Sequence, residues 1–363
     1  MNGLERYRRQ VALKGFGEMG QNHLAASRIL IAGIGGLGCP ALLYLAAAGA
    51  GTIGIADDDF VALSNLPRQV LFAASDVGQP KVEVAKRKIS ELNPEVKIIS
   101  YHHRLTNRNA LEIIEKYDIV IDGTDNFPSK YMLNDACLLL NKPLIYGSVS
   151  KFEGQVAAFN VAGSHTVSCN YRDLFAHQPS EAILNCAEEG VLGVVTGIIG
   201  TMQASEAIKI LTGIGESLAN RLLIFNALNL QSYLLEITPN PKAYQVPGNE
   251  KEFKEASYDW LCARDPKIVE ITREQFAEML NDNEVLFVDV REAGEQPQVD
   301  FCHKKIPLSH FLNEMKDIEE NKIVFFCQSG KRSMDAAQMF LDRYGESKKV
   351  YSLKDGVLSL QDS

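Results

Sequence analysis

The chain has 363 residues, 46% hydrophobic and 23% charged, so it can bury a sizeable core and is long enough for two domains. Its net charge of −9 argues against a surface that binds nucleic acid. The seven cysteines are scattered and form no CxxC pair, which argues against a disulfide framework and favours free thiols in a reducing compartment. The polar start MNGLERYRRQ does not resemble a signal peptide, and the apolar run 190–201 is too short to cross a bilayer. We therefore expect a cytoplasmic protein that contacts no membrane.

The stretch 28–51 organises the first half of the chain. Arg28–Ala32 is a short apolar run that predicts a buried strand, and the turn GIGGLG follows at once. Cys39–Ala48 then predicts a helix of small residues. A strand, a glycine turn and a helix start in this order suit a nucleotide phosphate, because glycine lets backbone N–H groups approach the phosphate oxygens. The glycines expected to bind the nucleotide are Gly33, Gly35 and Gly36.

Two charged residues support the nucleotide interpretation. The second predicted strand, Thr52–Ala56, ends in Asp57, 19 residues after Gly38 (57 − 38). An acidic side chain near this offset is typical of a group that binds a ribose hydroxyl. Lys81 opens the predicted helix Val82–Leu92, where a cation opposes the helix dipole, so we interpret it as the partner of an anion rather than a surface lysine.

The alternation of strands and helices continues downstream. The pattern predicts strands at 96–101, 118–122 and 143–146, helices at 109–116 and 129–140, and an antiparallel strand at 154–160. GTDN follows the 118–122 strand, at the sheet edge where doubly wound folds bind their ligands. A long loop or lid is predicted at 163–189 and a buried apolar helix at 193–211. We therefore expect an α/β fold: a Rossmann-like, doubly wound, mostly parallel sheet with added antiparallel strands.

A second, smaller α/β unit is predicted after a linker. Prolines and charges over 246–266 predict the linker, which separates a first domain at 1–245 from a second at 267–363. In the second domain we expect a helix at 272–280, strands at 285–290 and 322–326, and a helix at 334–344. Cys327 lies between the last strand and helix, with Lys331 and Arg332 nearby. This setting favours a sulphur anion, so we interpret Cys327 as a reactive thiolate rather than a structural thiol.

Four motifs, GIGGLG, DDDFVALSNLPRQ, GQPK and GTDN, occur in one order. Together they closely resemble the MoeB/ThiF/HesA family, bacterial relatives of the ubiquitin-activating enzymes, over about residues 4–240. Residues 267–363, with DVRE and CQSGKRS, resemble a rhodanese domain, which is a sulphur-transfer module. The resemblance implies an adenylyltransferase that uses ATP and Mg²⁺ to adenylate the C-terminal carboxylate of a small ubiquitin-like sulphur carrier of the MoaD or ThiS kind. The rhodanese-like domain would transfer sulphur from a donor such as a cysteine desulphurase or thiosulphate.

The resemblance also implies roles for residues of the phosphate path. Gly36 and its neighbours would bound the nucleotide, and Asp57 would hold the ribose. The residues that would line the path to the phosphates are Ser64, Asn65, Arg68 and Lys81.

Further roles concern the reacting end, the partner subunit and the loop thiol. Asp125, together with Asn126, would organise magnesium and the reacting carboxylate. Arg9 matches an arginine that reaches into the partner's site in family dimers, which implies a homodimer. Cys186 matches a position that some relatives use for a covalent link to the carrier, and the sequence leaves open whether it reacts or is a plain loop thiol.

The sequence departs from the family in its metal site. Most relatives hold a structural zinc on two CxxC pairs. The corresponding regions here are SCNYRDLF and PNPKAYQVPGN, which retain at most Cys169. Because a tetrahedral zinc site needs four ligands, we expect no structural zinc.

Two alternative functions stay open. An NAD-dependent oxidoreductase would use the glycine turn and Asp57, but it would leave Arg68, Lys81 and Asp125 without a role. A non-catalytic scaffold would bind the carrier or the sulphur donor, although every mapped position keeps its candidate residue. The sequence does not choose among molybdopterin biosynthesis, thiamine biosynthesis, tRNA thiolation and sulphur amino-acid supply.

Overall fold

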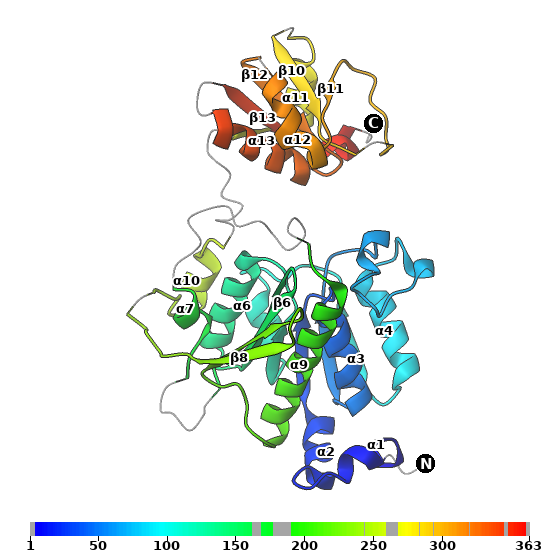
Figure 1. Ribbon diagram of the computed structural model, residues 1–363, viewed down its shortest axis with the longest axis vertical. Coiled ribbons are helices and arrows are strands. Elements are labelled where there is room, and N and C mark those ends of the chain that lie inside the picture. The colour runs from blue at the N-terminus through cyan, green and yellow to red at the C-terminus, as the bar shows by residue number, and fades with distance from the viewer. Residues whose placement is uncertain are drawn as a thin grey trace. The chain divides into compact units, whose positions relative to one another are not determined.

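A computed structural model describes residues 4–161, 168–176, 190–242, 244–258, 268–282, 284–292, 294–318, 320–344 and 348–360. The chain divides into two compact units, Met1–Tyr258 and Asp259–Ser363. Each unit has its own sheet and its own core (Figure 1).

The first unit is built on an eight-stranded sheet in the order β3-β2-β1-β4-β5-β6-β7-β8. Strands β1 to β5 pair in parallel, and β6, β7 and β8 are added antiparallel. This confirms the predicted sheet type, and β6 is the antiparallel strand predicted at 154–160. The strands are β1 Arg28–Ala32, β2 Thr52–Ala56, β3 Lys97–Tyr101, β4 Ile119–Asp122, β5 Leu144–Ser150, β6 Glu153–Phe159, β7 Arg221–Asn226 and β8 Gln231–Glu236. The helices are α1 Leu4–Val11, α2 Gly17–Ala26, α3 Gly38–Ala48, α4 Lys81–Leu92, α5 Ala110–Ile114, α6 Phe127–Leu139, α7 Tyr171–Leu174, α9 Gly193–Thr212 and α10 Glu250–Glu255.

The long apolar helix α9 is a core element of this unit. It has 20 residues and continues well beyond the apolar run 190–201. By length and composition alone, α9 could cross a membrane. In the structure it packs against α2, α3, β5 and β6 (Figure 1). Val195 and Ile199 are fully buried there, because an apolar surface is stabilised by removal from water. This burial identifies α9 as the predicted buried helix.

The predicted linker over 246–266 begins too early. α10 belongs to the first unit, where Phe253 is fully buried. The Asn107 side chain donates to the carbonyls of Lys254 and Ala256, both at 2.9 Å, and the Tyr258 hydroxyl donates to Asp135 at 2.8 Å. The polar composition suggested a linker, but two aromatic side chains anchor this segment to the unit as far as Tyr258. The predicted lid at 163–189 contains α7, and most of its residues lie outside the described part of the chain.

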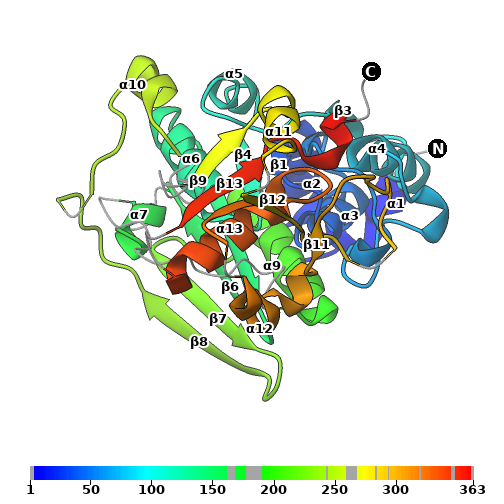
Figure 2. The ribbon, with the colours of Figure 1, turned by 90° about the horizontal axis from the view of Figure 1, so that it is seen from above.

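The second unit has a five-stranded, all-parallel sheet in the order β11-β10-β12-β13-β9. Strands β9, β13 and β12 lie side by side in Figure 2. The strands are β9 Ile268–Ile271, β10 Val285–Asp289, β11 Lys304–Lys305, β12 Lys322–Phe326 and β13 Lys349–Leu353, and the helices are α11 Arg273–Met279, α12 Phe311–Glu314 and α13 Lys331–Tyr344. Phe325 packs on Phe311 and Phe340, and Phe326 on Phe276, so the central strand β12 contributes to two separate core clusters.

Candidate active site

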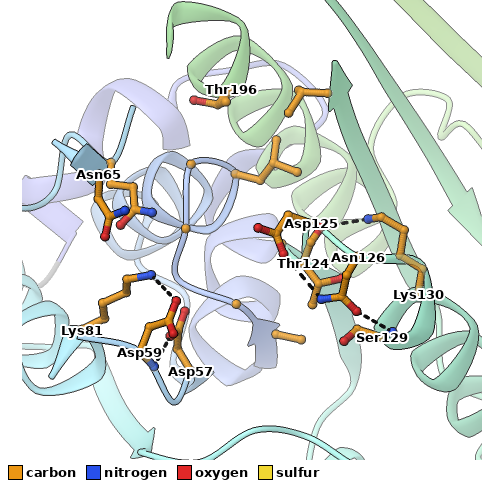
Figure 3. Close-up of a pocket in the computed structure, with 18 of the residues that line it drawn as sticks. Asp57, Asp59, Asn65, Lys81, Thr124, Asp125, Asn126, Ser129, Lys130 and Thr196 are labelled. Atoms are coloured by element: carbon orange, nitrogen blue, oxygen red, sulfur yellow. Dashed lines mark hydrogen bonds and ion pairs between the residues drawn. The ribbon is translucent and has the colours of Figure 1, made fainter. Parts of the chain in front are cut away.

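A cavity of about 460 Å³ lies at the carboxyl ends of the parallel strands of the first unit. Ala32 and Ala56, the last residues of β1 and β2, line it, together with the segment that follows β4. The predicted nucleotide-binding residues that line this cavity are Gly33, Gly35, Gly36, Asp57, Ser64, Asn65, Arg68, Lys81, Asp125 and Asn126. Lys81, Asp57 and Asp59 lie on one side of the cavity, and Asp125 and Asn126 on the other (Figure 3). The fold thus brings together side chains that are far apart in the sequence.

The glycine turn is compact because backbone atoms occupy the positions where side chains would lie at Gly33 and Gly38. Gly33 has a φ of +87°, a left-handed conformation that favours glycine. A Cβ on Gly38 would overlap the Gly33 carbonyl oxygen. α3 therefore begins directly at the cavity, and a helix N-terminus there favours a phosphate.

Asp57 is held in one orientation at the end of β2. One carboxylate oxygen accepts from the Ile34 N–H at 2.7 Å, and the other from the Asp59 N–H at 2.8 Å. Burial raises the pKa of Asp57, and the nearby Lys81 charge and these backbone hydrogen bonds act in the opposite direction. A fixed carboxylate that still lines the cavity suits the hydroxyl groups of a ribose.

Lys81 presents a nearly buried ammonium to the cavity. Its side chain is 5% exposed, and its Nζ lies 2.9 Å from Oδ2 of Asp59, which is 64% exposed. An anion that enters the cavity would compete with this exposed carboxylate for the ammonium. Because the partner can turn into water and the lysine cannot, Lys81 is suited to bind a phosphate.

The segment that carries Ser64, Asn65 and Arg68 is held against the start of α9. Arg68 Nη1 donates to the Ser64 carbonyl at 3.0 Å, and Thr196 Oγ1 donates to the Arg68 carbonyl at 3.3 Å. Asn65 Oδ1 accepts from the Ala62 N–H at 3.1 Å. The loop thereby places one cation and two polar side chains at the cavity.

The GTDN segment provides the opposite side. Asn126 caps α6 by accepting from the Ser129 N–H at 3.0 Å, and the Asp125 carboxylate is exposed beside it (Figure 3). One such carboxylate fits Mg²⁺, which usually binds one or two protein carboxylates together with phosphate oxygens and keeps several waters. Among the described residues, Asp57, Asp58 and Asp59 also lie within 4.8 Å of one another, as acidic groups often do without an ion.

The lining also includes residues that the sequence did not indicate, among them Gln69 and Lys130. Gln69 is 3% exposed, and its Oε1 has no hydrogen-bond partner in the described part of the chain. Lys130 is 5% exposed and points its ammonium at the segment before Asp125 (Figure 3). Gln69 adjoins the predicted Arg68 in NLPRQ, a signal that could have identified it. Lys130 lies one turn into α6 and carries no comparable signal.

The described lining of the cavity does not include Arg9, Cys186 or Cys169. Arg9 is exposed on α1 and is not among the residues that line the cavity. Cys186 lies outside the described residues. Cys169 is fully buried, and its Sγ donates to the Ile237 carbonyl at 3.1 Å. Burial raises the pKa of the Cys169 thiol to about 12, which disfavours the thiolate that a zinc ion requires.

Cys327 follows β12 directly, as predicted. Its side chain is buried, and Sγ lies 3.6 Å from Oγ of Ser333, which is on α13. Ser352 on β13 in turn donates to Ser333 Oγ at 2.9 Å. Ser333 Oγ therefore accepts from both Cys327 and Ser352, and its own hydroxyl donates to the Gly330 carbonyl at 3.1 Å. The sulphur lies at the start of a helix, where a negative charge is favoured.

Arg332 has a second partner besides Cys327. Its guanidinium donates to both carboxylate oxygens of Glu295, and its charge also interacts with Cys327. The hydrogen bonds to Glu295 raise the pKa of Arg332. The sequence around Arg332 does not indicate this ion pair, because Glu295 lies in a loop 37 residues away.

Comparisons with known proteins match each of the two units to a known family. A model of the ThiF family matches residues 7–246, and one of the rhodanese-like domain matches 272–363. A sulfur carrier protein adenylyltransferase of Thermus thermophilus is 44% identical, covering 71% of this chain and 96% of its own length. The adenylyltransferase and sulfurtransferase MOCS3-1 of Zea mays is 37% identical and covers 93% of this chain and 77% of itself. The probable adenylyltransferase/sulfurtransferase MoeZ of Mycobacterium tuberculosis is 35% identical, with corresponding shares of 91% and 86%.

Among solved structures, Escherichia coli MccB is similar in fold. It superposes with a TM-score of 0.59 at 21% identity, over 68% of this chain and 73% of its own. At this identity the similarity shows the fold alone.

Proposed function

Because the chain belongs to the ThiF family and carries a rhodanese-like domain after it, we propose that it adenylates the C-terminal carboxylate of a small sulphur carrier protein and then supplies sulphur to it. The observation that carries the proposal is the cavity at the strand ends, whose lining includes the fixed acid Asp57, the cations Arg68 and Lys81 and the exposed acid Asp125. A nicotinamide-dependent oxidoreductase would need only Asp57 among these.

Each group of the cavity has a task in this reaction. The carrier carboxylate attacks the α-phosphorus of ATP, the bond to the β-phosphate oxygen breaks, and pyrophosphate leaves. Asp57 would orient the ribose, while Lys81 and Arg68 would neutralise the charge that moves onto the leaving group. Mg²⁺, held by Asp125 together with ATP, would supply further charge neutralisation. Asn126 would orient the reacting end.

The second unit would then supply the sulphur. The Cys327 thiolate would attack the outer sulphur of thiosulphate and release sulphite, or attack the terminal sulphur of a cysteine desulphurase persulphide and release that enzyme's thiolate. Cys327 would then hold the sulphur as a persulphide, whose negative charge the helix start favours. We place the reaction in molybdopterin or thiamine biosynthesis or a related thiolation pathway. The proposal includes a cytoplasmic homodimer in which Arg9 acts in the partner's site, no structural zinc, and Cys186 as either a covalent link or a plain thiol.

The test is the exchange of radioactive pyrophosphate into ATP in the presence of a carrier of the MoaD or ThiS kind. The wild-type protein is expected to catalyse exchange. In Asp125→Ala the exchange rate is expected to fall about 100-fold or more, which is typical when a group that stabilises transition-state charge is removed. Glu91→Ala, which removes an exposed acid of α4 outside the cavity, is the control and is expected to keep the wild-type rate. Exchange near the wild-type rate in folded Asp125→Ala, or nicotinamide binding without exchange in the wild type, would contradict the proposal.

A further inference from the structure

A lysine is buried behind the GTDN segment. The Lys130 Nζ donates to Oδ2 of Asp122 at 2.9 Å, to the Thr124 carbonyl at 2.9 Å and to the Gly147 carbonyl at 2.8 Å. It also lies 5.0 Å from the ring centre of Tyr146. An ammonium has three hydrogens to donate, so each finds an acceptor.

Asp122 holds the same segment from its other side. Its Oδ1 accepts from the Thr124 N–H at 2.9 Å and from the Thr124 hydroxyl at 2.6 Å, while its Oδ2 accepts from Lys130. The N–H, the hydroxyl and the carbonyl of Thr124 are therefore all bound by one buried ion pair. The Thr124 carbonyl belongs to the planar peptide group that ends at the Cα of Asp125. The ion pair therefore fixes the backbone position from which the Asp125 side chain extends.

Stability alone does not account for this pair. Removal of two charges from water costs several kcal/mol per ion, and an apolar pair of the same volume often stabilises a fold as well or better. What an ion pair adds is orientation, because its hydrogen bonds have fixed directions and short lengths. The groups it orients lie at the cavity: both Thr124 and Lys130 line it, next to Asp125.

We propose that Lys130 is a positioning residue for adenylation, which acts through the Thr124 carbonyl to hold Asp125 in its reactive position. The inference rests on the proposed function and adds a residue to it. Lys130 is 5% exposed and donates all three ammonium hydrogens within the protein, so it does not need to contact the substrate. Its loss should therefore lower the turnover number of the exchange reaction and leave ATP affinity almost unchanged.

The experiment measures carrier-dependent ATP–pyrophosphate exchange and ATP affinity for the full chain and four variants. Lys130→Met is expected to lower kcat at least tenfold and to change the Kd for ATP less than threefold, whereas Lys130→Arg, which keeps a donor cation, recovers part of the rate. Lys130→Met leaves the Asp122 carboxylate buried without its partner and could prevent folding. If it does, the same measurements are made on the double variant Asp122→Asn with Lys130→Met, in which both side chains are neutral. The control is Lys88→Met, which removes a lysine paired with Asp76 and the Leu71 carbonyl outside the cavity, and it should keep the wild-type kcat.

A double-mutant cycle separates positioning from a merely structural role. If Lys130 acts through Asp125, then Lys130→Met combined with Asp125→Ala is no slower than Asp125→Ala alone. A double variant slowed by the full product of the two effects, or Lys130→Met with the wild-type kcat, would overturn the inference. A wild-type chain that exchanges no pyrophosphate would instead contradict the proposed function, so the two failures are distinguishable.

Discussion

Arg332 and Glu295 form a bidentate ion pair in the second unit: the guanidinium donates one hydrogen bond to each carboxylate oxygen, both at 2.6 Å. The pair links the first turn of α13, beside Cys327, to the loop that follows β10. These hydrogen bonds lower the pKa of Glu295 from its ordinary 4.5. The link is therefore strong at neutral pH and weaker in acid.

The first prediction is that Glu295 contributes an acid-sensitive part of the stability of the second unit. Because its pKa is lower in the folded state, its contribution is complete above the unfolded pKa of about 4.5 and is lost as the pH falls through the folded pKa. Calorimetric melting of the full chain between pH 6 and pH 3 should show a smaller acid-induced fall for Glu295→Gln than for the wild type. Parallel curves for the two proteins would mean that the pair contributes no pH-dependent stability.

The second prediction separates the two chemical steps. Cys327→Ala should keep ATP–pyrophosphate exchange and lose sulphur transfer to the carrier from thiosulphate or a persulphide donor. The reason is that Cys327 lies in the second unit and does not line the cavity of the first. Cys302→Ala, which removes an exposed thiol from the same unit, is the control and should retain both steps. Thiocarboxylate formed at the wild-type rate by Cys327→Ala, without free sulphide, would make Cys186 the better candidate.

The third prediction tests the action of Arg9 across a dimer. Arg9→Ala and Lys81→Ala should each reduce the exchange rate by about 10²-fold or more, since in the proposed function each removes a cation that would stabilise the transition state. Mixed dimers of the two variants should regain up to half of the wild-type sites, because one site in each would combine an intact Arg9 with an intact Lys81. Verified mixed dimers without recovery would place Arg9 outside the partner's site.

The fourth prediction concerns the region where relatives hold zinc. Asp173 Oδ1 accepts from the Asn240 N–H at 2.6 Å and from the Tyr244 hydroxyl at 2.8 Å, which links the two segments that lack the CxxC pairs. Elemental analysis should find no tightly held zinc, and a chelator should leave the melting temperature unchanged. Asp173→Ala should lose about 1–3 kcal/mol of stability, the usual cost of unpaired polar groups. One zinc per chain, or a chelator-sensitive melt, would show that metal links these segments.

Local patterns predicted the parallel part of the first sheet well. β1 and β2 occur at the predicted residues, because strands covered on both faces are continuous apolar runs. β7 and β8 were not predicted: they are antiparallel strands at the sheet edge, and β8 is exposed along its whole length, so no buried face imposes a pattern on it. The segment up to Tyr258 was assigned to a linker because its attachment depends on Asp135, which is distant in sequence.

In the candidate site, too, some residues could be predicted from local sequence and others depend on contacts between distant segments. Asp57, Lys81 and Asp125 could be found because each sits at the end of a strand or the start of a helix, within a short motif. Lys130 could not be found, since its role requires β4, β5 and α6 to meet around one ammonium. Similarly, nothing near Arg332 indicates that a distant glutamate will bind it.

The glycine turn has a consequence for genetics. At Gly38 the obstacle to a side chain is the Gly33 carbonyl oxygen, and at Gly123 it is the same oxygen, 2.6 Å from where a Cβ would lie. At Gly54 the obstacle is the side chain of Tyr117. A selection for second-site suppressors should therefore rescue Gly54→Ala through smaller residues at Tyr117. Gly38→Ala should yield only reversion to glycine, because no substitution elsewhere can remove a main-chain oxygen.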